Sequence, residues 1–215
     1  YWTWSRHLDW GYYSKPPMIA WLIALLASAG GDKEWAIRSG AVLLHSGTLA
    51  IVYSLALRIS GRDWAACAAV LSAAAMPASW AGSILMTPDA PLAFFWVLAM
   101  FAFHRAVNGH AYGWWLAGFA LGLGMLSKYT TVFLWFGTIA FILLYNRRWL
   151  KTKELYISML ISLFIFIPVI VWNFQNDFIS FSFQSERVNM SESGIKPDFF
   201  FQELCGQNLY NNPFN

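Results

Sequence analysis

The chain has 215 residues, of which 58% are hydrophobic and only 12% are charged. Soluble domains carry about 25% charged residues, so this composition excludes an ordinary soluble fold and indicates a membrane protein. The net charge of +3 is too small to indicate a nucleic-acid partner. Most basic residues lie in short connectors between apolar segments, as expected of a membrane protein. Cys67 and Cys205 are too few to form a disulfide framework.

The first part of the chain, residues 1–36, contains no stretch long enough to cross a membrane. The segment from Lys15 to Ala29 is apolar but short, and it opens with Pro16 and Pro17. Proline is tolerated in the first turn of a helix, where its missing N–H has no partner. We therefore expect an N-terminal outer loop with short helices that lie in the membrane interface.

Long charge-poor stretches follow, and each approaches the length of about 20 apolar residues that matches the bilayer. Six spanning helices are predicted, at about 37–57, 64–86, 89–107, 112–127, 130–146 and 155–173. The predicted fold class is an all-α polytopic transmembrane bundle over residues 37–173. Because the chain starts without Met and stops in a polar, aromatic stretch, we expect a fragment, with residues 174–215 beginning a large outer loop.

The basic residues predict the direction of these helices. They lie in alternate connectors: Arg58 and Arg62, then Arg105, then Arg147, Arg148, Lys151 and Lys153. The positive-inside rule makes these connectors cytoplasmic. The first loop, the turn at 86–89, the turn at 127–130 and the segment after 173 then face outward. Cys67 and Cys205 fall on opposite sides and are not expected to pair.

This topology brings Asp89, Lys128 and Lys15 to one membrane face although they are far apart in sequence. Ionisable residues at the ends of spans are costly to bury, which makes them candidates for a functional site. Cations suit a phosphate, aromatic side chains suit a sugar, and a short interfacial helix suits the entry of a lipid chain. A substrate carried by a lipid at the outer face would need these parts.

Four strings resemble one family of membrane enzymes. They are the first loop from Tyr1 to Trp21, Met86-Thr-Pro-Asp-Ala-Pro-Leu92, Leu121-Gly-Leu-Gly-Met-Leu-Ser-Lys-Tyr-Thr130, and the segment from Trp172 to Gln184. In this order they resemble bacterial glycosyltransferases related to dolichyl-phosphate-mannose protein mannosyltransferases and aminoarabinose lipid A transferases.

The resemblance implies a GT-C fold and transfer of a sugar from a polyprenyl-phosphate carrier at the non-cytoplasmic face of a bacterial inner membrane. The acceptor would be a protein, a lipid or a glycan. Family members carry an Asp-Glu pair before the first-loop motif, and its carboxylate is the expected general base. That position falls upstream of Tyr1, so no catalytic residue is assigned, and nearby Asp9 is not given the role.

The resemblance also implies a phosphate-binding role for cations that match the motifs. Relatives carry an acidic residue before the Pro-Pro pair, where this chain has Ser14, whereas Lys15 keeps a cation that could meet the carrier phosphate. A divalent metal is compatible with such enzymes, but no cluster of ligands with metal spacing stands out in the sequence.

Each candidate residue has a functional and a structural interpretation. The amine of Lys128 offers three donors to a phosphate, or it reaches the lipid headgroups as a snorkelling lysine. Asp89 follows Pro88, so it either organises the phosphate-binding cations or caps a helix. Lys15 either attracts the carrier phosphate or contacts lipid headgroups.

The first loop supplies two further candidates. The guanidinium of Arg6 can hold two phosphate oxygens, although a solvated surface role is its alternative. Tyr13, like its neighbours Trp10 and Tyr12, could stack on a sugar or belong to an aromatic belt at the interface. His45 is interpreted as a polar residue between helices, and Gly118, Gly122 and Gly124 as small residues that permit close packing.

Two functions from other classes remain compatible with the sequence. A transporter or flippase of a lipid-linked sugar would also need outer cations, but it should show repeated halves or broken helices in pairs. No clear internal repeat is visible. A structural membrane subunit without chemistry would leave Asp89 as a helix cap and Lys128 as a snorkelling residue.

Overall fold

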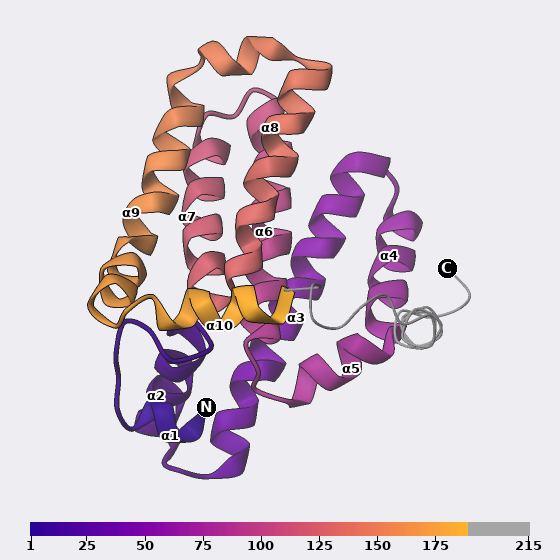
Figure 1. The fold of residues 1–215 in the computed structure, drawn as a ribbon. Helices are drawn as coiled ribbons and strands as arrows, with labels where there is room; N and C mark the ends of the chain where they lie inside the picture. Colours follow the sequence, from indigo (N-terminus) through magenta and orange to yellow (C-terminus); the bar gives the residue numbers. More distant parts are fainter. Residues whose placement is uncertain (189–215) are drawn as a thin grey trace, which may run out of the picture.

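The computed structural model describes residues 1–188, and every regular element in that range is helical. The predicted all-α membrane bundle is therefore confirmed. In Figure 1 the long helices run along a common direction, while α1, α2 and α10 gather at one end. The elements are α1 Trp2–Ser5, α2 Met18–Gly30, α3 Glu34–Ser60, α4 Asp63–Ala75, α5 Pro77–Ile84, α6 Asp89–Val107, α7 Tyr112–Ser127, η1 Tyr129–Val132, α8 Phe133–Tyr145, η2 Arg147–Lys151, α9 Lys153–Gln175 and α10 Ile179–Val188.

Each predicted span falls largely on helical residues, but the helices differ in length and one of the spans is broken. Within residues 1–188, three helices are long and apolar enough to cross a membrane, namely α3, α6 and α9. The predicted spans at 112–127 and 130–146 correspond to α7 and to the shorter apolar segment Tyr129–Tyr145. The number of six spans and the domain boundaries stay predictions. The expected outer loop from 174 is described only as far as residue 188, and Cys205 lies outside that range.

The predicted single helix at 64–86 is wrong, because the chain breaks between α4 and α5. The two helices meet at an angle of 73°, with Met76 extended at φ −65° and ψ 130° and Pro77 in the first turn of α5. Proline disfavours the helical conformation in the residue before it. Counted as one bent span, α4 and α5 would raise the number of possible spans in the described part of the chain to four.

The start of α2 also differs from the prediction. Neither Pro16 nor Pro17 lies in the first turn, since Pro17 is the N-cap and the helix begins at Met18. Pro16 precedes another proline, which favours an extended backbone at that residue. With 13 residues, α2 is as short as expected for a helix that does not span the membrane.

Small residues form the contacts at the centre of the bundle. Helix α7 packs on both α6 and α9, and Ala99, Ala102, Ala117 and Ala120 are fully buried. A Cβ atom on Gly118 would lie 2.4 Å from the Ser158 carbonyl oxygen of α9. Small residues allow the backbones of membrane helices to approach this closely.

The remaining glycines of the Gly-rich run behave in the same way. A Cβ on Gly122 would meet Ile165 of α9 at 2.8 Å, and a Cβ on Gly124 would meet Thr131 at 2.7 Å. The prediction that these glycines permit close packing is therefore confirmed.

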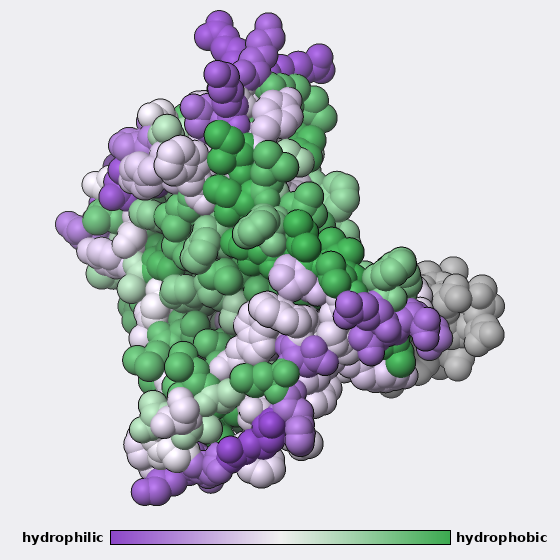
Figure 2. All heavy atoms as spheres, turned by 90° about the vertical axis from the view of Figure 1, so that its left-hand side faces the viewer, coloured by the Kyte–Doolittle hydropathy of each residue, from purple (hydrophilic) through white to green (hydrophobic). Residues whose placement is uncertain are grey.

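Large apolar side chains cover the outside of the bundle. Leu71, Leu144 and Phe164 expose more than two thirds of their surface, at 69%, 80% and 75%. Figure 2 shows hydrophobic residues along the middle of the molecule and hydrophilic residues at its two ends. Such a belt matches the hydrocarbon layer of a bilayer, and the chain is an integral membrane protein.

The two ends of the bundle carry different parts of the sequence (Figure 1). The α3–α4 connector, the end of α6 and η2 lie at one end, and they contain the basic residues that the positive-inside rule makes cytoplasmic. The first loop, the start of α6, the α7–η1 turn and α10 lie at the other end, which we call the loop end. Asp89 and Lys128 thus share one end, as predicted.

Candidate functional site

An ion pair between Lys128 and Asp89 lies at the loop end. The Nζ atom of Lys128 donates to Oδ1 of Asp89 at 2.8 Å. The side chains expose 34% and 61% of their surface, respectively. Ion pairs with this exposure typically stabilise a fold by only about 0–1 kcal/mol. The pair therefore keeps two opposite charges at the surface without a strong hold on either.

The ends of two helices position this pair. Lys128 directly follows α7 and has an extended backbone, with φ −157° and ψ 134°, and its N–H donates to the Gly124 carbonyl at 2.9 Å. Asp89 is the first residue of α6 after the N-cap Pro88, so its carboxylate belongs to the first turn of the helix, where it accepts the hydrogen bond from Lys128. The predicted position at a helix start is confirmed, whereas its role there, as a cap or as an organiser of the cations, stays a prediction.

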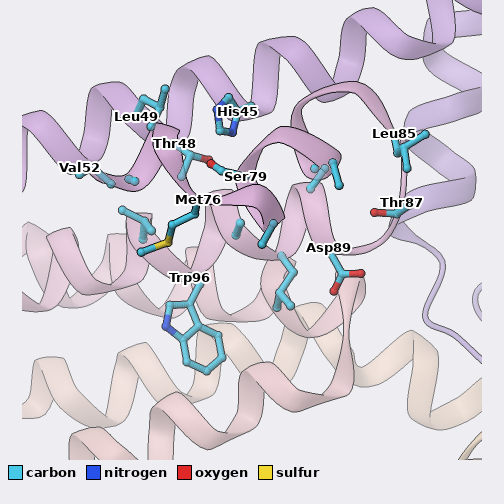
Figure 3. A pocket seen from close by; sticks show the side chains of 18 residues that line it. His45, Thr48, Leu49, Val52, Met76, Ser79, Leu85, Thr87, Asp89 and Trp96 are labelled. Carbon is cyan, nitrogen blue, oxygen red and sulfur yellow. The ribbon is translucent and has the colours of Figure 1, made fainter. Parts of the chain in front are cut away.

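Asp89 also borders a cavity of about 730 Å³ between α3, α4, α5 and α6. Figure 3 shows Asp89 and Thr87 together at one end of it, with Trp96 and Val52 farther along. Most of the lining is apolar, and His45, Thr48 and Ser79 add isolated polar groups. The bend between α4 and α5 places both helices against this space. The sequence did not predict the cavity, because the break at Pro77 was not recognised.

Lys15 belongs to the same end of the bundle. It is half-buried, and its carbonyl accepts the N–H of Tyr12 at 3.1 Å. Met18 of α2 packs with Leu126 of α7 in one buried cluster. Since Met18 is three residues after Lys15 and Leu126 is two residues before Lys128, this packing brings the two lysine-containing segments together.

Arg6 has partners of its own in the first loop and the following connector. Its guanidinium forms an ion pair with Asp32 and lies over the ring of Trp2, 5.0 Å from the centroid. Both side chains of the ion pair are substantially exposed, at 42% and 48%. The arginine thus joins the first loop to the α2–α3 connector, and its predicted contact with phosphate stays a prediction.

The aromatic residues of the first loop pack against other elements. The ring of Tyr13 is 55% exposed and lies 5.0 Å from the ring of Phe183 in α10. Trp10 meets Trp21 edge to face at 5.2 Å, and Tyr12 stacks on Trp4 at 4.7 Å. Tyr13 keeps enough free surface to touch a sugar, whereas Tyr12 is buried.

Tyr1 is a neighbour of the ion pair that the sequence did not predict. Burial raises the pKa of its phenol, the Asp89 carboxylate raises that pKa further, and the Lys128 ammonium lowers it. The phenol therefore lies within electrostatic reach of both charges. No sequence signal indicates this proximity, because it depends on how the first loop folds over the start of α6.

Metal ligands are not grouped in the described part of the chain. No three His, Cys, Asp or Glu side chains in residues 1–188 come close enough to hold an ion together. Cys67 is exposed and forms no disulfide. The divalent metal that the resemblance allows stays an untested prediction.

Comparison with known proteins gives similar chains of one kind. The lipid A galacturonosyltransferase RgtD of Rhizobium johnstonii is 29% identical over 200 residues, which cover 91% of this chain and 41% of that protein. The undecaprenyl phosphate-alpha-4-amino-4-deoxy-L-arabinose arabinosyl transferase of Pseudomonas aeruginosa is 28% identical over 69% of this chain and 28% of its own length. The enzyme of that name from Pseudomonas paraeruginosa is 27% identical over 78% and 32%, respectively.

The chain thus spans less than half the length of these curated relatives. No solved structure matches it significantly. Residues 14–172 match the family described as dolichyl-phosphate-mannose-protein mannosyltransferase. This match includes Lys15, Asp89 and Lys128 and covers well over half of the chain. The chain therefore belongs to the dolichyl-phosphate-mannose-protein mannosyltransferase family.

Proposed function

We propose that this chain is the donor-binding part of a membrane glycosyltransferase, which moves a sugar from a polyprenyl-phosphate carrier to an acceptor at the outer face. The Lys128–Asp89 ion pair at the mouth of an apolar cavity carries the proposal. The family supports the class of reaction. Two of the relatives have undecaprenyl phosphate in their names, which supports a donor of that kind.

Lys128 is suited to exchange its partner for a phosphate. An exposed ion pair is weak, so a phosphate can take the place of the Asp89 carboxylate at little cost. Hydrogen bonds between an ammonium and a phosphate are charge-assisted and stronger than neutral ones. Lys15 would add a second cation from the first loop, with Arg6 as a further candidate. Asp89 would hold the Lys128 amine in place when no donor is bound.

The cavity beside Asp89 is suited to the hydrocarbon part of the carrier. Its volume of about 730 Å³ lies within the range of about 300–1,000 Å³ that is common for ligand sites. An isoprenoid chain would gain little free energy by moving from the lipid into this cavity, because both surroundings are apolar. The phosphate contacts would therefore supply most of the selectivity. The charged end of the cavity is the end where the carrier phosphate would lie.

The reaction would be an inverting displacement at the anomeric carbon. The acceptor oxygen forms the new bond while the bond from the anomeric carbon to the phosphate oxygen breaks, and the electron pair leaves with the polyprenyl phosphate. Lys128 and Lys15 would stabilise the charge that grows on that phosphate. A carboxylate upstream of Tyr1, expected from the family resemblance, would take the proton of the acceptor hydroxyl. Tyr13 would offer a ring to the sugar.

The acceptor and the location follow from the relatives and from the topology. The name of RgtD contains lipid A, and we propose a lipid of that class as the acceptor in preference to a protein. The site would face the periplasm of a bacterial inner membrane, because the basic connectors lie at the opposite end of the bundle.

A transporter or flippase is the alternative from another class. The similar proteins do not support it, since RgtD and both arabinosyl transferases are named as transferases. Transporters of this kind consist of repeated halves, with a broken helix at the corresponding position of each half. Among the described residues α4–α5 is the one broken pair, so a second, corresponding break does not accompany it there.

Replacement of Lys128 by Ala in the complete protein tests the proposal. We expect the affinity for undecaprenyl phosphate, measured by fluorescence titration in detergent micelles, to fall by about tenfold or more, because charged hydrogen bonds contribute about 1.5–3 kcal/mol. Sugar transfer in membranes should fall with it. The melting temperature should hardly change, since the ion pair is exposed.

Lys33→Ala is the matched control. Lys33 is also an exposed lysine at the loop end, but it precedes α3 and has no part in the proposed site. It should keep both affinity and transfer. Undiminished binding by the Lys128 variant would refute the proposed phosphate site. An equal loss of affinity in both variants would also refute it, because the loss would then come from the overall surface charge.

A further inference from the structure

Helix α10 crosses the loop end of the bundle and does not continue the direction of α9 (Figure 1). The turn between them contains Asp177 and Phe178, whose φ angles of 52° and 54° are left-handed. Residues other than glycine rarely adopt this conformation, and it persists where the surroundings enforce it. The Phe178 N–H donates to the Asn173 carbonyl at 2.7 Å, which fixes the turn to the end of α9.

The first contact of α10 is with the backbone of the first loop. The side-chain amide of Gln184 donates to the Ser14 carbonyl at 2.7 Å, and the hydroxyl of Ser180 donates to the Tyr12 carbonyl. Ser180 is fully buried. Both bonds end on main-chain oxygens just before Lys15, so they fix the path of the backbone that carries this lysine.

The second contact of α10 is with the residue after Lys128. The ring of Phe181 lies 5.2 Å from the ring of Tyr129, and Tyr129 also meets Phe166 of α9 at 6.1 Å. The Tyr129 hydroxyl is buried beside Ser180 of α10 and Asn173 of α9. Contacts of both the ring and the hydroxyl therefore hold Tyr129 against α9 and α10, and Lys128 is its direct neighbour in the chain.

We propose that α10 positions Lys15 and Lys128 relative to each other, with Gln184 and Phe181 as positioning residues of the phosphate site. This inference rests on the proposed function, because it assigns a task to the two lysines. They belong to separate segments, and a phosphate binds two cations more tightly when both are already in place. One face of α10 contacts both segments, within four residues of its sequence.

A double-mutant cycle in the complete protein tests this coupling. Gln184→Met keeps the length of the side chain but cannot donate to the Ser14 carbonyl. We expect it to weaken binding of undecaprenyl phosphate by about threefold to tenfold, the loss typical of one hydrogen bond. In a Lys15→Ala background the same change should have almost no further effect, since Gln184 acts through that lysine. Phe181→Leu should behave in the same way toward Lys128→Ala.

Ser185→Ala is the control within α10. Ser185 is exposed, and its hydroxyl donates to the Ser182 carbonyl in the same helix, so its loss should leave binding unchanged. A Gln184 residue that only stabilises the fold would weaken binding by the same factor with or without Lys15, and this additivity in both cycles would overturn the role of α10. If neither lysine variant changes the affinity, the proposed function fails. If the lysine variants do weaken binding and the α10 substitutions add to that loss independently, the role of α10 is refuted but the proposed function stands.

Discussion

At the scale of single residues, the sequence indicated which charges matter but not how they meet. Asp89 and Lys128 were predicted at one membrane face because the lengths of apolar segments fix which turns share a side. Their direct contact at 2.8 Å depends on the packing of α6 against α7. The nearby Tyr1 phenol was not predicted, since loop folding has no periodic sequence signal.

The hydroxyl of Tyr12 hydrogen-bonds to three backbone groups of the first loop. This hydroxyl donates toward the carbonyls of Trp4 and His7, at 3.1 and 3.0 Å, and accepts the Asp9 N–H at 3.2 Å. Burial raises the pKa of Tyr12 above its ordinary value of 10.0, the hydrogen bond from the Asp9 backbone lowers it, and the Asp9 charge raises it. The folded chain therefore keeps the proton more firmly than the unfolded chain.

The sign of this shift predicts a loss of stability at alkaline pH. Above about pH 10 the unfolded state releases the Tyr12 proton while the folded state retains it, so the free energy of unfolding falls as the pH rises. The melting temperature of the complete protein, followed by tryptophan fluorescence, should fall between about pH 8 and about pH 11. Tyr12→Phe should lower the melting temperature at the lower pH and reduce its further decline.

Tyr112→Phe is the control for this titration. Tyr112 is the first residue of α7 and is exposed, and this helix begins at the end of the bundle opposite the loop end (Figure 1). The melting temperature of this variant should fall at alkaline pH as much as that of the unchanged protein. A decline in the Tyr12 variant as steep as that of the unchanged protein would contradict the assignment to Tyr12.

At the scale of elements, apolar length and glycine content predicted most helices, but local breaks were hidden. The stretch at 64–86 is uniformly apolar, so only Pro77 indicated that it forms two helices. The bend matters because α4 and α5 both line the cavity beside Asp89. The contact of α10 with the first loop joins residues more than 160 positions apart, and no pattern in a single sequence predicts such a pair.

The glycines of α7 were predicted correctly, and Gly118 allows a quantitative test. A methyl group at this position would lie 2.4 Å from the Ser158 carbonyl, which belongs to the α9 backbone and cannot rotate away. Overpacking of this kind typically costs about 1–3 kcal/mol. Gly118→Ala should therefore lower the melting temperature in detergent and reduce the fraction that elutes as a single species.

Gly137→Ala supplies the matched comparison. Gly137 lies in α8, and a methyl group there would have no neighbour within 4 Å. Alanine is better than glycine in a helix by about 1 kcal/mol, so this variant should be neutral or slightly stabilised. Equal losses in the two variants would mean that the α7–α9 contact is looser than the distance indicates.

At the scale of the whole molecule, the charge distribution predicts the orientation in the membrane. Figure 2 shows hydrophilic residues at the two ends of the molecule and hydrophobic residues between them. The proposed chemistry needs the loop end outside, because it is the end that contains Lys128, Asp89 and the cavity mouth. The positive-inside rule gives the same direction from an independent set of residues.

Labelling of single cysteines in intact bacterial cells tests this orientation. In a background with Cys67 and Cys205 replaced by Ser, we would introduce Lys33→Cys at the loop end or Arg148→Cys in η2, both at exposed positions. A membrane-impermeant maleimide should label position 33 once the outer membrane is permeabilised, and it should label position 148 only after the inner membrane is opened. The reverse pattern would place the ion pair in the cytoplasm. The lysines could then meet a lipid phosphate only in the inner leaflet, and the proposed transfer at the outer face would be refuted.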